Sequence, residues 1–119
     1  MRSLTNMRES FTAVLERART LTGEFATEPY EAAWAAEARW FVRTLDRTDP
    51  GTRLRVTTQI SPDGLNWCDL EPARELTGDL ESWTSSEFGG WLRLKGTVES
   101  DSGAESPGAN VMIYLALKS

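Results

Sequence analysis

The sequence predicts an all-β domain: an antiparallel β-sandwich or jelly roll with a short N-terminal helix or arm. Two observations carry this prediction. Several runs of residues alternate between apolar and polar side chains, which is the period of a half-buried strand. Short clusters of Gly, Pro, Ser and Asp separate these runs, as expected for turns between strands. The 119 residues suffice for one domain, and we divide them into an arm at 1–18 and a sandwich at 19–119.

The first residues fit two different structures. Between residues 4 and 18 the apolar side chains recur at spacings of three and four, which is the pattern of a helix. Phe11, Ala13 and Leu15 also alternate with polar or smaller residues, which is the pattern of a strand. Both alternatives stay open, and we expect a short helix or an extended arm, followed by a strand near residues 17–25.

Residues 31–45 pose the same choice. Their many alanines favour a helix, but residues 38–45 alternate between apolar and charged or polar side chains, which favours a strand there. Asp49-Pro50-Gly51 is a strong turn signal, and another alternating run begins at residue 53. The simplest prediction is two adjacent antiparallel strands joined by this turn.

Residues 53–60 give the clearest strand, and a tight turn follows it. In the turn Ser61 is followed by proline, which presets φ, and Gly64 accepts the positive φ that other residues resist. We expect the Asp63 carboxylate to bind backbone N–H groups of the turn, and Trp67 to pack beneath it on the returning strand. These four residues, Ser61, Asp63, Gly64 and Trp67, are therefore predicted to be structural.

The rest of the chain continues the strand-and-turn pattern. A polar connection over 71–87 contains a short strand at 81–84, and another strand covers 91–98. Residues 99–109 form a loop without large apolar side chains. Residues 110–118 are apolar on both faces, which is typical of a central strand.

Composition narrows the classes of function. The chain carries 13 basic and 18 acidic residues, a net charge of −5, which argues against nucleic-acid binding. It has no histidine and one cysteine, Cys68, so neither a histidine-dependent catalytic triad nor a cysteine cluster for a metal is expected. Its carboxylates are scattered without a distinctive pair. No apolar run is long enough to cross a membrane, and the first residues lack the apolar core of a secretory signal. We expect a cytoplasmic protein that is not an enzyme and has no cofactor or metal.

Three short motifs carry a family resemblance: SPDGLNW at 61–67, WLRLK at 91–95, and the apolar run from Val111 to a closing Lys118. Over residues 20–119 the sequence resembles small β-sandwich proteins encoded among the structural genes of bacteriophages and prophages. The resemblance implies a component of a virion or phage-like particle, located on the capsid surface, on a head fibre or at the tail. It also implies partners that are other protein subunits, a second copy, or a glycan, with the arm at 1–18 used for docking.

The tryptophans are the remaining candidates for a binding site. There are five, and core packing explains most tryptophans in a sandwich. Trp83 is the best candidate for an exposed contact, because the segment around it, 80–88, is polar. Phe88 and Tyr30, in turn-like surroundings, come second. A carbohydrate-binding module in which exposed Trp83 stacks on a sugar is therefore the alternative to a particle component.

Overall fold

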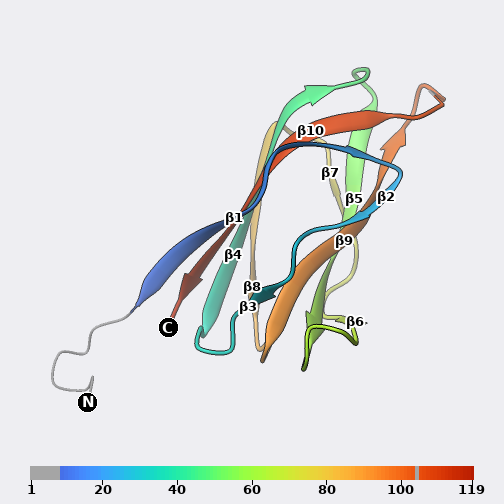
Figure 1. Cartoon of the computed structure of the whole chain (residues 1–119). Coiled ribbons are helices and arrows are strands. Elements are labelled where there is room, and N and C mark those ends of the chain that lie inside the picture. Colours follow the sequence, from blue (N-terminus) through green and yellow to red (C-terminus); the bar gives the residue numbers. More distant parts are fainter. Residues whose placement is uncertain (1–8, 104) are drawn as a thin grey trace, which may run out of the picture.

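Two antiparallel β-sheets packed face to face make up the computed structural model, which describes residues 9–103 and 105–119 (Figure 1). Sheet A has the strand order β1-β10-β4-β8 and sheet B the order β2-β9-β5-β6, with β3 beside β9 and β7 beside β5. The predicted antiparallel sandwich is confirmed. Sheet A consists of β1 (Ser10–Thr22), β10 (Gly108–Lys118), β4 (Glu37–Arg47) and β8 (Leu80–Ser86); sheet B of β2 (Glu24–Ala26), β3 (Tyr30–Glu31), β9 (Trp91–Ser100), β5 (Thr52–Ser61), β6 (Cys68–Asp69) and β7 (Arg74–Leu76).

The order of the strands is that of a jelly roll. If β2 and β3 are taken as one arm, and β6 and β7 as another, the chain has eight arms in sequence. Sheet A then reads 1-8-3-6 and sheet B reads 2-7-4-5, so that arm 1 pairs with arm 8, 2 with 7, 3 with 6 and 4 with 5. This is the pattern of one long hairpin rolled up into two layers.

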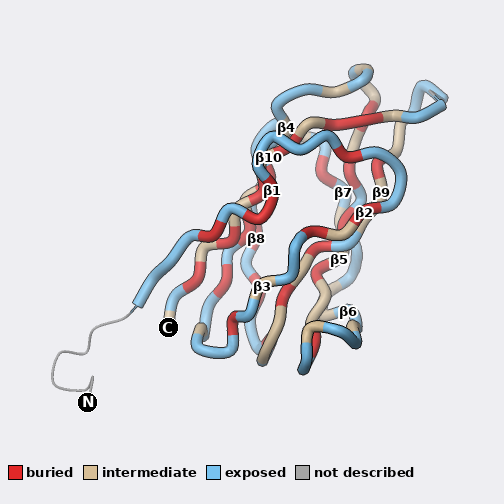
Figure 2. Tube along the Cα trace, in the orientation of Figure 1, coloured by how far each residue is buried: buried red, intermediate tan, exposed pale blue. Residues whose placement is uncertain are grey.

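The core lies between the sheets, where the inward side chains of the alternating strands meet (Figure 2). Trp40, Leu54, Leu92 and Leu115 are among its most deeply buried members. Gly96 marks a place where the core tolerates no side chain. A Cβ there would lie 2.3 Å from the backbone oxygen of Arg55 and 3.0 Å from the ring of Phe25.

The prediction of an N-terminal helix is wrong for residues 9–18, the part of that segment that the structure describes. Residues 10–18 lie in β1, which pairs with β10 from Ser10 opposite Lys118 to Thr22 opposite Gly108. The predicted boundary at 18/19 thus falls inside a strand, while residues 1–8 lie outside the described part. Two irregularities interrupt the register, between Val14 and Glu16 and between Glu16 and Arg19. The described residues at helical spacing, Phe11, Val14 and Ala18, are exposed, whereas Ala13 and Leu15 face the core as in a strand.

The strands predicted at 38–45, 53–60, 81–84, 91–98 and 110–118 are all present, as parts of β4, β5, β8, β9 and β10. The predicted pairing of the first two is wrong. β4 lies in sheet A and β5 in sheet B, so the turn around Asp49 carries the chain from one layer to the other. Alternation in sequence fixes which side chains share a face of a strand, but it does not choose the neighbouring strand.

Candidate functional site

The turn after β5 is built as predicted. Oδ1 of Asp63 accepts the backbone N–H groups of Leu65 and Asn66 at 2.9 Å each, and Ser61 Oγ accepts those of Asp63 and Gly64. Gly64 has a φ of +79°. The hydrogen bonds from Asn66 and Leu65 hold the pKa of Asp63 far below its ordinary value. All the Asp63 contacts are internal to the turn, so the carboxylate acts as a structural cap.

The packing of Trp67 beneath this turn stays a prediction. The indole of Trp91 lies against the turn, 3.3 Å from the position that a Cβ on Gly64 would take. Trp67 is half-buried under the guanidinium of Arg93, which lies 4.3 Å from its ring centre. Arg93 Nε also donates to Gln59 Oε1 at 2.9 Å, so the outer side of sheet B is held by its own polar contacts.

Trp83 is a core residue, and its prediction as an exposed contact is wrong. Its side chain is 6% exposed and stacks on Trp40, with ring centres 6.3 Å apart. The Arg74 guanidinium covers the ring at 4.6 Å from its centre. Trp40 Nε1 donates to Ser85 Oγ, and that hydroxyl donates in turn to Glu71 Oε2. A polar segment thus supplies one large apolar side chain to a core that other strands complete.

The two secondary candidates, Phe88 and Tyr30, lie in different surroundings. Phe88 is 4% exposed and belongs to the core, so it is not a surface contact. Tyr30 is half-buried and stacks on Phe11 of β1, with ring centres 6.3 Å apart. Phe11 itself is 53% exposed. Tyr30 therefore supports the open end of β1, a role that the sequence did not indicate.

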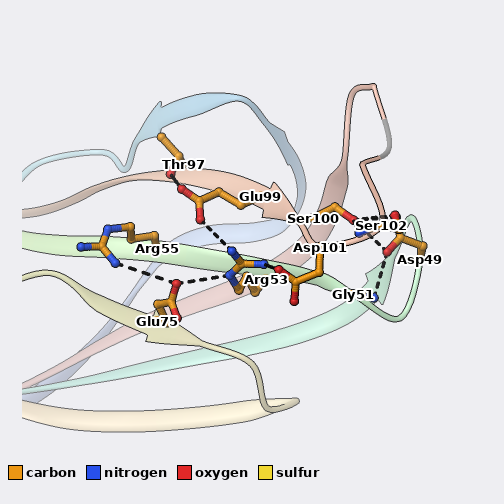
Figure 3. Close-up of polar contacts among 10 residues, drawn as sticks. All are labelled: Asp49, Gly51, Arg53, Arg55, Glu75, Thr97, Glu99, Ser100, Asp101 and Ser102. Carbon is orange, nitrogen blue, oxygen red and sulfur yellow. Dashed lines mark hydrogen bonds and ion pairs between the residues drawn. The ribbon is translucent and has the colours of Figure 1, made fainter.

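The polar side chains around the start of β5 form a structural network (Figure 3). Arg53 pairs with Glu75 at 3.2 Å, with Glu99 at 3.3 Å, and with Asp101. The hydrogen bond to Glu75 raises the pKa of Arg53, and the charge of Asp101 adds to this against partial desolvation. Because each charge already has its partner within the network, this cluster ties β5, β7 and β9 together.

Asp49 fixes the crossing from β4 to β5. Its carboxylate accepts the Gly51 N–H at 2.8 Å and the Ser100 hydroxyl at 3.0 Å. Burial acts to raise the pKa of Asp49, but the hydrogen bonds from Ser100 and Gly51 outweigh it, so this pKa is lowered. In the described part of the chain, no cluster of three or more acidic or cysteine side chains is arranged to hold a metal, and no helix is long and apolar enough to cross a membrane.

The side of sheet A that points away from sheet B carries apolar side chains in register across neighbouring strands. Val14 lies opposite Tyr114, and Tyr114 opposite Phe41, so that one apolar row crosses three strands. A second row runs from Met112 through Arg43 to Leu80, which is 63% exposed. We call this surface the outer face of sheet A; it consists of Ser10, Thr12, Val14, Glu37, Arg39, Phe41, Arg43, Asp46, Leu80, Ser82, Thr84, Ser86, Asn110, Met112, Tyr114, Ala116 and Lys118.

Charged groups surround the apolar rows with a positive bias. A groove of about 580 Å³ at one end of this face is lined by Phe41, Arg39 and Lys118, together with Glu37. Arg43 lies exposed in the second row, and Asp46 lies opposite Asn110 on the same face. Three cations against two carboxylates form this face of a chain whose net charge is −5. The signal for this surface was present in the sequence, because residues 110–118 are apolar on both faces, yet a central strand explained it.

No protein-family model and no curated protein matches this sequence. Solved structures give likeness in fold alone. One likeness is to a chain in the structure of the infectious bursal disease virus Gx strain, with a TM-score of 0.54 and 13% identity. The match covers 95% of this chain and 32% of that chain. The structure of FLHE matches with a TM-score of 0.48 and 16% identity, over 94% of this chain and 95% of that chain. The structure of a family two carbohydrate esterase from Cellvibrio japonicus matches with a TM-score of 0.44 and 11% identity, over 94% of this chain and 34% of that chain. The chain thus spans about a third of the virus chain that it resembles.

Proposed function

We propose that this protein is a non-catalytic structural module of a phage-like particle, and that it docks on a neighbouring protein subunit through the outer face of sheet A. The observation that carries this proposal is the apolar row of Val14, Tyr114 and Phe41 across three strands of one sheet. In a free β-sandwich the outer face of an antiparallel sheet is normally polar, because it faces water. A partly apolar outer face is typical of an interaction surface.

The charges on this face define the partner. Arg39, Arg43 and Lys118 lie around the apolar row, so the matching surface has an apolar centre and an acidic rim. On the outer side of sheet B, Arg53 and Arg93 are engaged with acidic or aromatic partners of the same chain, which suits a surface exposed to solvent. On the outer face of sheet A, Arg39 donates to a neutral group, the Ser82 hydroxyl.

The jelly-roll order of strands and the likeness in fold to a chain of a virus structure are compatible with a particle component. This support is at the level of the fold, and it names no partner. The alternative, carbohydrate binding, has lost its main residue, because Trp83 is buried. Trp34, 39% exposed in the loop before β4, is the indole that a glycan test would now target.

Sedimentation of the chain in its source culture tests the proposal. An epitope-tagged wild-type chain is expected to move into the fast fractions of a sucrose gradient, together with assembled particles, after particle production is induced. Phe41→Asp places a charge at the β4 end of the apolar row and is expected to return the chain to the slow fractions.

Thr57→Asp is the matched control, because it adds the same charge to the outer side of sheet B, next to Lys95. This variant is expected to sediment with the particles. A wild-type chain that stays in the slow fractions of induced cultures, or a Phe41→Asp variant that sediments like wild type, would overturn the proposal. Thermal unfolding of both variants confirms that they are folded.

A further inference from the structure

β1 is an outermost strand of sheet A, and no strand of the described residues pairs with its other edge (Figure 1). Residues 10–15 pair with β10 up to Val14 without interruption, and they contain no charged residue, proline or glycine. Phe11 and Val14 are 53% and 38% exposed. Natural sheets normally protect such an edge with charges, prolines, bulges or short strands, because an open edge pairs with other chains.

The second half of the same strand shows these protective devices. The register with β10 shifts around Glu16, and Ala18 has a φ of +49°. Arg17 and Arg19 follow in this segment, and Asn110 Nδ2 donates to the Ala18 backbone oxygen. The bulged half therefore cannot continue a flat ladder, and pairing is confined to residues 10–15.

The other sheet edges are less suited to pairing. In sheet B they are formed by β2, β3, β6 and β7, none longer than three residues. In sheet A the opposite edge is β8, with seven residues, and its exposed side chains are mostly Ser and Thr. Residues 10–15 are thus the longest regular, uncharged and apolar edge in the described part of the chain.

We propose that two copies of this chain pair antiparallel through residues 10–15 of β1, which joins their A sheets into one continuous sheet. The segment is complementary to itself. A two-fold axis at Ala13 places Phe11 opposite Leu15 of the second copy, and both side chains are on the face toward the core. The pairing covers the exposed part of Phe11 with apolar surface, and because the segment is uncharged it places no like charges opposite each other.

Analytical ultracentrifugation of the purified full chain tests this proposal. Wild type is expected to sediment as a dimer, with twice the 13.3 kDa mass of one chain. Phe11→Lys places a charge at the edge on the inward side, which is a protective device of natural edge strands. This change is expected to weaken dimerisation at least about tenfold.

Leu80→Lys is the matched control, because Leu80 is an exposed apolar residue on β8 at the other edge of the same sheet. Leu80→Lys is expected to leave the dimer intact. Phe41→Asp is also expected to leave the dimer intact, and because it is the variant that should abolish docking through the outer face of sheet A, it separates the two proposals. Hydrogen exchange gives an independent measure: amides of residues 10–15 are expected to exchange more slowly as the wild-type concentration rises. A monomeric wild type, or a Phe11→Lys variant that dimerises like wild type, would overturn the proposal.

Discussion

Trp83→Ala is expected to destabilise this protein strongly, because its indole is buried in the core and stacks on Trp40. A buried aromatic side chain removes about 150–250 Å² from water, which at about 25 cal/mol per Å² is worth about 4–6 kcal/mol before the unfolded state is considered. Residual burial in the unfolded chain reduces this figure by about 10–40%. The stack on Trp40 adds about 1 kcal/mol. We therefore expect a loss of about 4 kcal/mol in the free energy of unfolding, within the usual range for such truncations.

Urea unfolding followed by far-ultraviolet circular dichroism measures this loss. Trp34→Ala is the matched control, because Trp34 is 39% exposed and has no stacking partner among the ring pairs of the described residues. Its cost is expected to be about half that of Trp83→Ala, because over a third of its surface stays in water and no stacked ring is lost. If the alanine variant at 83 is too unstable to purify, Trp83→Phe, which keeps most of the apolar volume, gives a smaller loss that is still measurable. Equal effects at positions 83 and 34 would refute the assignment of Trp83 to the core.

Two further changes test local structure. Gly96→Ala forces a Cβ against the Arg55 backbone oxygen and is expected to lower the free energy of unfolding in urea by about 3 kcal/mol. In the control Gly78→Ala the new Cβ meets only the Glu81 side chain, so the loss should be less than about 1 kcal/mol, and equal losses would contradict this reasoning. The pKa of Asp63 is lowered in the folded state, so its contribution to stability is complete above about pH 4 to 5 and is lost as the pH falls below that range. Unfolding measured from neutral pH to about pH 2 should therefore show a difference between wild type and Asp63→Asn that shrinks with acid, and a constant difference would count against the cap.

Residues close together in the chain explain the parts of this structure that were predictable. The turn from Ser61 to Asn66 closes through contacts between residues two or three positions apart, so its chemistry can be read directly from its letters. The strands at 53–60 and 91–98 show a regular period of two, because one side of each lies on the core. Turn chemistry and alternation are both local information, and they were sufficient to predict this turn and these strands.

The failures all involve contacts between distant residues. Trp83 looked exposed because its own segment is polar, but Trp40, its stacking partner, comes from another strand, and Ser85 binds Trp40 across 45 positions. Phe11 and Val14 suggested a helix in the segment of β1, but they are exposed, and the segment is a strand because it pairs with β10 at the far end of the chain. Phe41 and Tyr114 form one apolar row only because β4 and β10 are neighbours in the same sheet.

Local periodicity therefore determines which segments are strands, where the chain turns, and which side chains share a face. The pairing of strands, and with it the burial of Trp83, the open edge of β1 and the outer face of sheet A, follows from how the rolled hairpin brings distant segments together. An alternating strand is compatible with many neighbours, since hydrogen bonds of the backbone are the same for every sequence. The choice among them is made by the packing of the two complete sheets against each other.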